Sequence, residues 1–154
     1  MAIEIEKKFL LNYFPEDLMT RGISICQGYM MNKKGLVVRV RLSGDHGFLT
    51  IKGATHNGSR KEFEYPVPKK DVEEMLDLFC KKPLIEKTRY HIEFKGFEWV
   101  IDKFYGENLG LVVAEIELSS IDQPFETPDW IGKEVTHDPK FFNSNLIETP
   151  YSTW

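Results

Sequence analysis

The sequence predicts a mainly β fold of the α+β class, built on an antiparallel sheet or barrel of eight strands. Apolar and polar residues alternate with a period of two over eight segments, which is typical of strands with one buried face. Short turn-forming sequences, such as Asn57-Gly58-Ser59, separate several of these segments. Only one convincing helix interrupts them, between the fifth and sixth strands, which favours an antiparallel arrangement.

The expected elements follow in chain order. We expect strands at residues 3–11, 24–31, 36–43, 47–53, 59–66, 84–92, 97–105 and 111–120. The helix spans residues 68–82, with Asp71 as its expected N-cap and an apolar stripe that includes Val72 and Leu76. Shorter helices are expected at residues 15–20, 129–135 and 139–146.

Composition sets the broad class of protein. The chain has 154 residues, of which 42% are hydrophobic, so we expect one globular domain over residues 1–154. Its net charge of −4 argues against a nucleic-acid binder. No apolar run approaches the roughly 20 residues that span a bilayer, and Glu4 and Glu6 lie where a signal peptide is basic. Two cysteines do not suffice for a disulfide framework, so we expect a cytoplasmic protein without membrane partners.

The polar faces of the predicted strands carry like-charged doublets. Five strands place two charges of one sign at positions i and i+2, which lie on the same face. These doublets are Glu4/Glu6, Arg39/Arg41, Glu62/Glu64, Lys87/Arg89 and Glu115/Glu117. Like charges side by side on a sheet face are unfavourable, so this pattern calls for an explanation.

Two explanations stay open at this point. A sheet with one solvated face would show the same alternation. Alternatively, the charged face points inward and lines a tunnel that is wide enough for one small ligand. Six cations on this face suit a multivalent anion, and they are Lys8, Arg39, Arg41, Lys52, Lys87 and Arg89. Seven carboxylates suit hard cations such as Mg²⁺ or Mn²⁺, and they are Glu4, Glu6, Glu62, Glu64, Asp102, Glu115 and Glu117.

These residues together resemble the triphosphate tunnel metalloenzymes, also called the CYTH domain family. Glu4-Ile5-Glu6-Lys7-Lys8 matches the ExExK signature of that family, and the other charged pairs follow in the family's order. Gln27-Gly28-Tyr29 and the segment from Trp130 to Thr136 are similar to short bacterial members. The resemblance covers nearly the whole chain.

The resemblance implies an eight-stranded antiparallel closed β-barrel tunnel with a polar, charged interior and helices packed outside. It implies that Glu4, Glu6 and Glu117 hold one metal ion, and that Glu62, Asp102 and Glu115 hold a second with Glu64 nearby. The six cations would bind the phosphate chain. Mg²⁺ (or Mn²⁺) is the implied cofactor and a small-molecule triphosphate the implied partner, with a homodimer left open.

Several activities occur in this family. They include inorganic triphosphatases, thiamine triphosphatases, class IV adenylate cyclases and RNA triphosphatases, and the fold does not decide among them. The short form with Gln-Gly-Tyr is most similar to the inorganic triphosphatases, so we expect hydrolysis of tripolyphosphate to diphosphate and phosphate. Cyclisation of a nucleoside triphosphate, hydrolysis of thiamine or nucleoside triphosphate, and non-catalytic binding of a phosphorylated ligand are the alternatives.

A catalytic pair is expected at Lys8 and Tyr29. Lys8 ends the ExExK strand on the face of Glu4 and Glu6. Tyr29 lies on the next strand, and consecutive strands are usually neighbours, so a cross-strand pair is expected. Such a pair could orient the attacking water or protonate the leaving phosphate, whereas simple charge screening by Lys8 is the alternative.

Overall fold

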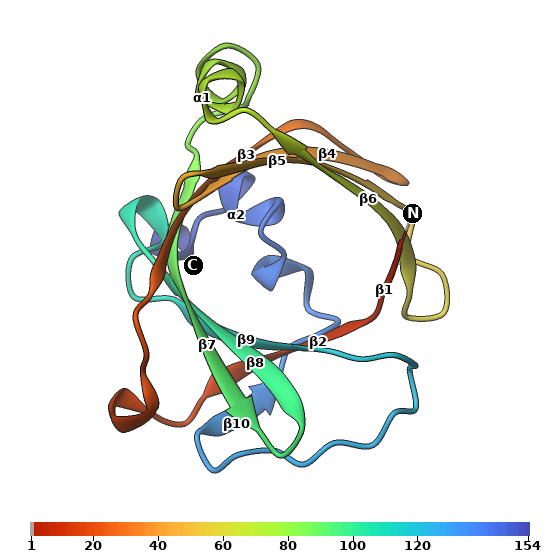
Figure 1. Cartoon of the computed structure of the whole chain (residues 1–154), viewed down its shortest axis with the longest axis vertical. Helices are drawn as coiled ribbons and strands as arrows, with labels where there is room; N and C mark the ends of the chain where they lie inside the picture. Colours follow the sequence, from red (N-terminus) through yellow and green to blue (C-terminus); the bar gives the residue numbers. More distant parts are fainter. Residues whose placement is uncertain (1) are drawn as a thin grey trace.

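The computed structural model describes residues 2–154, and it contains ten strands in one antiparallel sheet. The strands are β1 (Ala2–Glu4), β2 (Glu6–Leu11), β3 (Ile23–Lys33), β4 (Leu36–Ser43), β5 (His46–Gly53), β6 (Arg60–Val67), β7 (Ile85–Phe94), β8 (Phe97–Phe104), β9 (Val112–Glu117) and β10 (Ile131–Glu134). They are hydrogen-bonded in the order β1-β6-β5-β4-β3-β7-β8-β9-β2-β10. The mainly antiparallel β fold is therefore confirmed. The sheet curls into a ring (Figure 1), but its order has two ends, so the prediction of a closed barrel with eight strands is wrong.

The difference arises at Ile5, where the first predicted strand divides into β1 and β2. β1 pairs with β6, whereas β2 pairs with β9. The backbone of Ile5 joins β1 to β2, and its carbonyl oxygen accepts a hydrogen bond of 2.7 Å from the Leu118 amide. A peptide segment rather than a continuous strand ladder thus links the two sides of the ring.

The tenth strand occupies a segment for which we predicted a helix. Residues 129–135 contain β10, which pairs with the edge of β2 that does not face β9, with Ile131 opposite Leu11. That edge needs partners for its backbone groups. The side chains of Trp130, Ile131 and Val135 are buried there. Edge pairing and apolar burial together explain why this segment is a strand.

The apolar side chains of the strands lie mainly on the outside of the ring. The helix α1 (Lys69–Leu78) covers one part of this face, where Val72 and Leu76 pack in a buried cluster with Val40. The predicted helix is thus confirmed, although it is shorter than expected and Asp71 is not its N-cap, because Pro68 precedes the first turn without a side-chain cap. Figure 1 shows α1 outside the ring.

Aromatic residues cover another part of the outer face. Trp99 on β8 contacts Phe9, Phe125 and Trp130 edge to face, with ring centroids 5.5–5.9 Å apart. This packing uses segments that are far apart in the chain, and it fixes β8 and β2 beneath residues 125–131. The charged side of these strands must then face the interior.

The C-terminal segment takes a place that differs from the predicted one. It contains η3 (Pro139–Phe141), α2 (Asn145–Glu148) and η4 (Tyr151–Thr153), and it lies within the outline of the ring in Figure 1. The buried residues Phe141, Leu146 and Ile147 hold it against β7, β8 and β9. It covers one end of the ring. The prediction that the helices pack outside is therefore wrong for this segment. Two short 3₁₀ turns, η1 (Glu16–Leu18) and η2 (Gly106–Asn108), complete the structure. Among residues 2–154 no helix is long and apolar enough to cross a membrane.

Candidate active site

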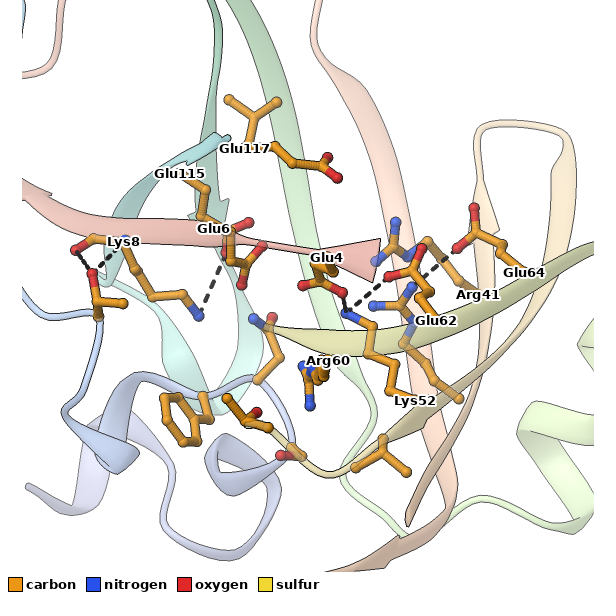
Figure 2. A pocket seen from close by; sticks show the side chains of 18 of the residues that line it. Glu4, Glu6, Lys8, Arg41, Lys52, Arg60, Glu62, Glu64, Glu115 and Glu117 are labelled. Carbon is orange, nitrogen blue, oxygen red and sulfur yellow. Dashed lines mark hydrogen bonds and ion pairs between the residues drawn. The ribbon is translucent and has the colours of Figure 1, made fainter. Parts of the chain in front are cut away.

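A charged cavity of about 650 Å³ occupies the interior of the ring. The side chains that line it come from most strands of the sheet and from the C-terminal segment. Thirteen of the fourteen predicted site residues line it, and they are Glu4, Glu6, Lys8, Tyr29, Arg39, Arg41, Lys52, Glu62, Glu64, Lys87, Arg89, Glu115 and Glu117. The charged face therefore points inward, and the solvated-face alternative is wrong. Figure 2 shows carboxylates and cations facing one another across this space.

Lys52 bridges two of the carboxylates at one side of the cavity. Its Nζ lies 2.6 Å from Glu4 Oε2 and 3.4 Å from Glu62 Oε2. Lys52 and Glu62 are register partners on β5 and β6, so the sheet itself sets this contact. Burial disfavours the Glu4 carboxylate, but Glu62 and Lys52 outweigh burial and hold the pKa of Glu4 well below its usual range. The hydrogen bond with Glu4, followed by burial, raises the pKa of Glu62 to about 7, so these two carboxyl groups share one proton more readily than they ionise together.

Glu6 lies among other acids. It is opposite Glu117 in the register of β2 and β9, an unfavourable pairing of like charges. Burial, followed by the charges of Glu115 and Glu4, raises the pKa of Glu6 to about 8. Burial also raises the pKa of Glu117. A cation delivered to this part of the cavity would relieve the repulsion.

Lys8 is held at the end of the cavity that the C-terminal segment covers. Its Nζ donates a hydrogen bond of 2.9 Å to the carbonyl oxygen of Phe141 and lies 3.4 Å from Glu115 Oε1. Although burial disfavours the ammonium, Glu115 and Glu6 keep the pKa of Lys8 above its usual value. In turn, Lys8 keeps the pKa of the buried Glu115 low. Lys8 is thus a charged group at a fixed place.

Asp102 lies behind the cavity wall rather than on it. Only 1% of its surface is exposed, and it forms a bidentate pair with Arg89 at 2.7 and 2.8 Å. Its Oδ2 also lies 2.9 Å from Lys87 Nζ. Burial works against the carboxylate, but Lys87 and Arg89 hold the pKa of Asp102 far below its usual range. Asp102 is therefore engaged by two cations in a place where it orients them.

Lys87 is perturbed in the direction opposite to Lys8. Burial lowers its pKa to about 7, and the neighbouring guanidinium groups of Arg89 and Arg41 act in the same direction. Its Nζ donates a hydrogen bond of 3.0 Å to Oδ1 of Asn143 in the C-terminal segment. Near neutral pH this side chain is poised between the ammonium and the free amine.

The arginines differ in how they are partnered. Arg39 donates to Thr50 Oγ1 at 3.1 Å and to Glu64 Oε2 at 3.4 Å. Arg41 and Arg60, by contrast, have no ion pair among residues 2–154. The Nε atoms of both Arg39 and Arg41 are buried without a hydrogen-bond partner. Burial lowers the pKa of Arg41 to about 9. An anion in the cavity would give Arg41 and Arg60 a partner.

Tyr29 reaches the cavity from β3. Its hydroxyl oxygen accepts a hydrogen bond of 3.1 Å from Nε2 of the fully buried Gln27, so its own proton can be donated elsewhere. The predicted reason for pairing it with Lys8 is wrong, because β2 and β3 are not neighbours in the sheet. The register partner of Lys8 is Glu115, and that of Tyr29 is Arg39. Lys8 and Tyr29 nevertheless line the same cavity.

Sequence reasoning did not single out several lining residues. Arg60 precedes the Glu62/Glu64 doublet with the same parity, so this alternation could have identified it. Phe142, Asn143 and Ser144 come from the C-terminal segment, and no periodic pattern marks them. They reach the cavity only because distant apolar residues fold that segment across the end of the ring.

The donor set suits a hard divalent cation, although no such site is preformed. The carboxylate oxygens of the cavity are the ligands that Mg²⁺ and Mn²⁺ prefer. Over the described part of the chain, however, no three acidic, histidine or cysteine side chains converge closely enough to hold an ion. The residues fit the chemistry of such a metal, but ion pairs with the cavity cations must first be exchanged.

A curled antiparallel sheet around a cavity of acids and cations defines a tunnel protein for multivalent anions. The chain belongs to the CYTH domain family, which it matches over residues 2–148. It is 47% identical over 154 residues to an inorganic triphosphatase of Acetivibrio thermocellus, covering 100% of this chain and 99% of that protein. It is 34% identical over 148 residues to an inorganic triphosphatase of Nitrosomonas europaea, covering 93% and 95%.

Solved structures agree with this assignment. The crystal structure of an inorganic triphosphatase superimposes with a TM-score of 0.67 at 32% identity, covering 93% of this chain and 96% of that chain. A protein of Pyrococcus horikoshii superimposes with a TM-score of 0.58 at 18% identity, covering 77% and 80%, and shares the fold.

Proposed function

We propose that this protein hydrolyses inorganic triphosphate to diphosphate and phosphate inside the charged cavity, with Mg²⁺ or Mn²⁺ as cofactor. The observation that carries the proposal is the mixed charge of the cavity wall. Seven cations line the cavity together with seven carboxylates. Phosphate oxygens bind the cations. The carboxylates then need another counter-charge, which a divalent metal ion supplies. The two full-length relatives that are named inorganic triphosphatases support the same substrate.

The roles of the residues follow from their places. We assign phosphate binding to Lys8, Arg39, Arg41, Lys52, Lys87 and Arg89. We assign metal binding to six of the carboxylates that line the cavity, namely Glu4, Glu6, Glu62, Glu64, Glu115 and Glu117. The bound cation would act as a Lewis acid beside the phosphates. For Asp102, its double ion pair supports a positioning role toward Lys87 and Arg89, in place of direct metal binding.

Lys8 and Tyr29 remain our assignment for the chemical step. The Lys8 ammonium is fixed by Phe141 and Glu115, so it can neutralise charge that develops on a phosphoryl oxygen. The Tyr29 hydroxyl accepts from Gln27 and keeps its proton for donation, as a general acid on the leaving phosphate requires. Both side chains line the same cavity from different strands, which supports this assignment.

A phosphate-release assay tests the proposal directly. Purified protein is incubated with tripolyphosphate, ATP or thiamine triphosphate, each with Mg²⁺, Mn²⁺ or EDTA. We expect metal-dependent release from tripolyphosphate at a kcat/KM at least tenfold above the other substrates. Equal or faster turnover of ATP, or formation of a cyclic nucleotide, would transfer the assignment to another CYTH activity. Binding of tripolyphosphate without turnover would make the protein a non-catalytic binder.

Two further expectations accompany the proposal. Cys26 and Cys80 are both free thiols, which supports a reducing compartment such as the cytoplasm. A homodimer stays a prediction, which sedimentation analysis of the purified protein would test.

A further inference from the structure

Lys52 occupies the place between two carboxylates that a metal ion would need. Its ammonium contacts Glu4 at 2.6 Å and Glu62 at 3.4 Å, and only 11% of its side chain is exposed. Figure 2 shows the ammonium directed at Glu4, with Glu62 next to it. A buried carboxylate needs a counter-charge, and here a lysine of the same protein supplies it. In the metal-free protein, Lys52 is thus the counter-ion of Glu4 and Glu62.

The absence of a preformed metal site has the same origin. Between residues 2 and 154 no three metal-ligating side chains converge, even though seven carboxylates line one cavity. Ion pairs direct four of these carboxylates toward cations, and they are Glu4, Glu62, Glu64 and Glu115. Lys52 alone contacts two of them, so it is the largest single obstacle to ligation by Glu4 and Glu62.

We propose that Lys52 is an internal placeholder for the metal ion, and that it exchanges the carboxylates Glu4 and Glu62 for a phosphate oxygen when metal and triphosphate enter. This inference rests on the proposed function and deepens it. The exchange leaves Lys52, Glu4 and Glu62 each with a partner of opposite charge before and after binding. Because the metal requires Lys52 to leave and the triphosphate gives it a new partner, each ligand favours the binding of the other through this one side chain.

Arg60 provides a matched control within the same site. It lies opposite Glu4 in the register of β1 and β6 and lines the same cavity. Its charge acts on Glu4, but among the described residues it forms no ion pair or hydrogen bond with Glu4. Removing Arg60 therefore changes the general potential near Glu4, whereas removing Lys52 also vacates the contact position.

The test measures the two ligands separately, so no hydrolysis is needed. Binding of Mn²⁺ alone is followed by the electron paramagnetic resonance of free Mn²⁺, and binding of tripolyphosphate alone by calorimetry in EDTA. The proteins are wild type, Lys52→Met, Lys52→Arg and Arg60→Met. Far-ultraviolet circular dichroism checks the fold, and Lys52→Gln replaces Lys52→Met if that variant does not fold.

We expect opposite effects on the two ligands. Lys52→Met should bind Mn²⁺ about tenfold more tightly or better, since a full charge in direct contact is removed. It should bind tripolyphosphate about tenfold more weakly. Arg60→Met should tighten Mn²⁺ about threefold at most, because a charge that makes no contact is better screened. Lys52→Arg should stay near wild type for Mn²⁺.

Two outcomes would overturn the inference. Unchanged or weaker Mn²⁺ binding by Lys52→Met would mean that Lys52 holds the site together rather than occupying it. Equal tightening by Arg60→Met would reduce its role to general electrostatics. If instead wild type binds neither Mn²⁺ nor tripolyphosphate and hydrolyses nothing, the proposed function itself fails, and the two failures are thus distinguished.

Discussion

Replacing Glu6 with glutamine should stabilise the metal-free protein. Burial and the charges of Glu115 and Glu4 raise the pKa of Glu6 to about 8, from 4.5 in an unperturbed chain. In the folded protein at pH 7, Glu6 is therefore mainly protonated, whereas in the unfolded chain it is ionised. Glutamine has nearly the shape of the protonated acid and carries no charge in either state.

The magnitude follows from the proton that folding must take up. Protonating a carboxyl group of pKa 4.5 at pH 7 costs about 3 kcal/mol. Water in the cavity and relaxation of neighbouring side chains reduce this, so we expect Glu6→Gln to raise the free energy of unfolding by about 1–3 kcal/mol at pH 7. For a domain of this size, that raises Tm by about 3–10 °C.

The pH dependence gives the sharper check. A carboxyl group with a raised pKa in the folded state destabilises the protein increasingly as pH rises from 4.5 to 8. The advantage of Glu6→Gln should therefore be small at pH 5 and largest near pH 8. Calorimetric melting in EDTA at pH 5, 6.5 and 8 measures it. Glu115→Gln is the matched control, and it should lower Tm, because the buried ammonium of Lys8 loses the one carboxylate with which it forms an ion pair among the described residues. A gain that does not change with pH, or a lower Tm for Glu6→Gln, would refute the reasoning.

Other predictions concern the remaining charges of the cavity. Binding of tripolyphosphate in EDTA should weaken as pH rises from 6 to 8, because Lys87, whose pKa is about 7, loses its charge, and calorimetry should find this dependence reduced in Lys87→Met. Asp102→Asn should lower the free energy of unfolding by about 3 kcal/mol in a urea titration, because two buried cations lose their partner; unchanged stability would contradict the positioning role. Lys8→Ala and Tyr29→Phe should each lower kcat on tripolyphosphate with little change in KM, and their effects should not add in the double variant; an additive double variant with a raised KM would indicate charge screening alone. Saturating Mg²⁺ together with tripolyphosphate should raise Tm above that in EDTA, since both bind the folded state.

The alternation of charged and apolar residues predicted which side chains share the charged face of each strand, and thirteen of the fourteen predicted site residues line the cavity. Along a strand this depends only on local parity, and outer packing by residues such as Trp99 and Val72 decides which face turns inward. Arg60 has the same parity as Glu62 and Glu64 and lines the cavity, so alternation extended to the end of the strand would have identified it. Looking only for like-charged doublets omits it.

The partners of these side chains could not be predicted in the same way. Parity says nothing about which strands are adjacent, so Lys8 was paired with Tyr29 instead of Glu115. Asp102 has the parity of the cavity face, yet Arg89 and Lys87 fold over it and separate it from the cavity. The carbonyl oxygen of Phe141 holds Lys8 through a backbone group, which no side-chain pattern can reveal.

The division of the first strand at Ile5 separates the carboxylates into two groups that belong to different strand pairs. Glu4 is anchored to β6, which also carries Glu62 and Glu64, whereas Glu6 is anchored to β9, which carries Glu115 and Glu117. On this side of the ring only one residue of backbone, Ile5, joins the two groups. A cation bound by carboxylates of both groups would link the two sides across this joint and fix the width of the tunnel there. Cutting the chain at Ile5 in a circular permutant would leave such a cation as the main link across this joint, while the remaining strands would still connect the two sides the other way around the ring.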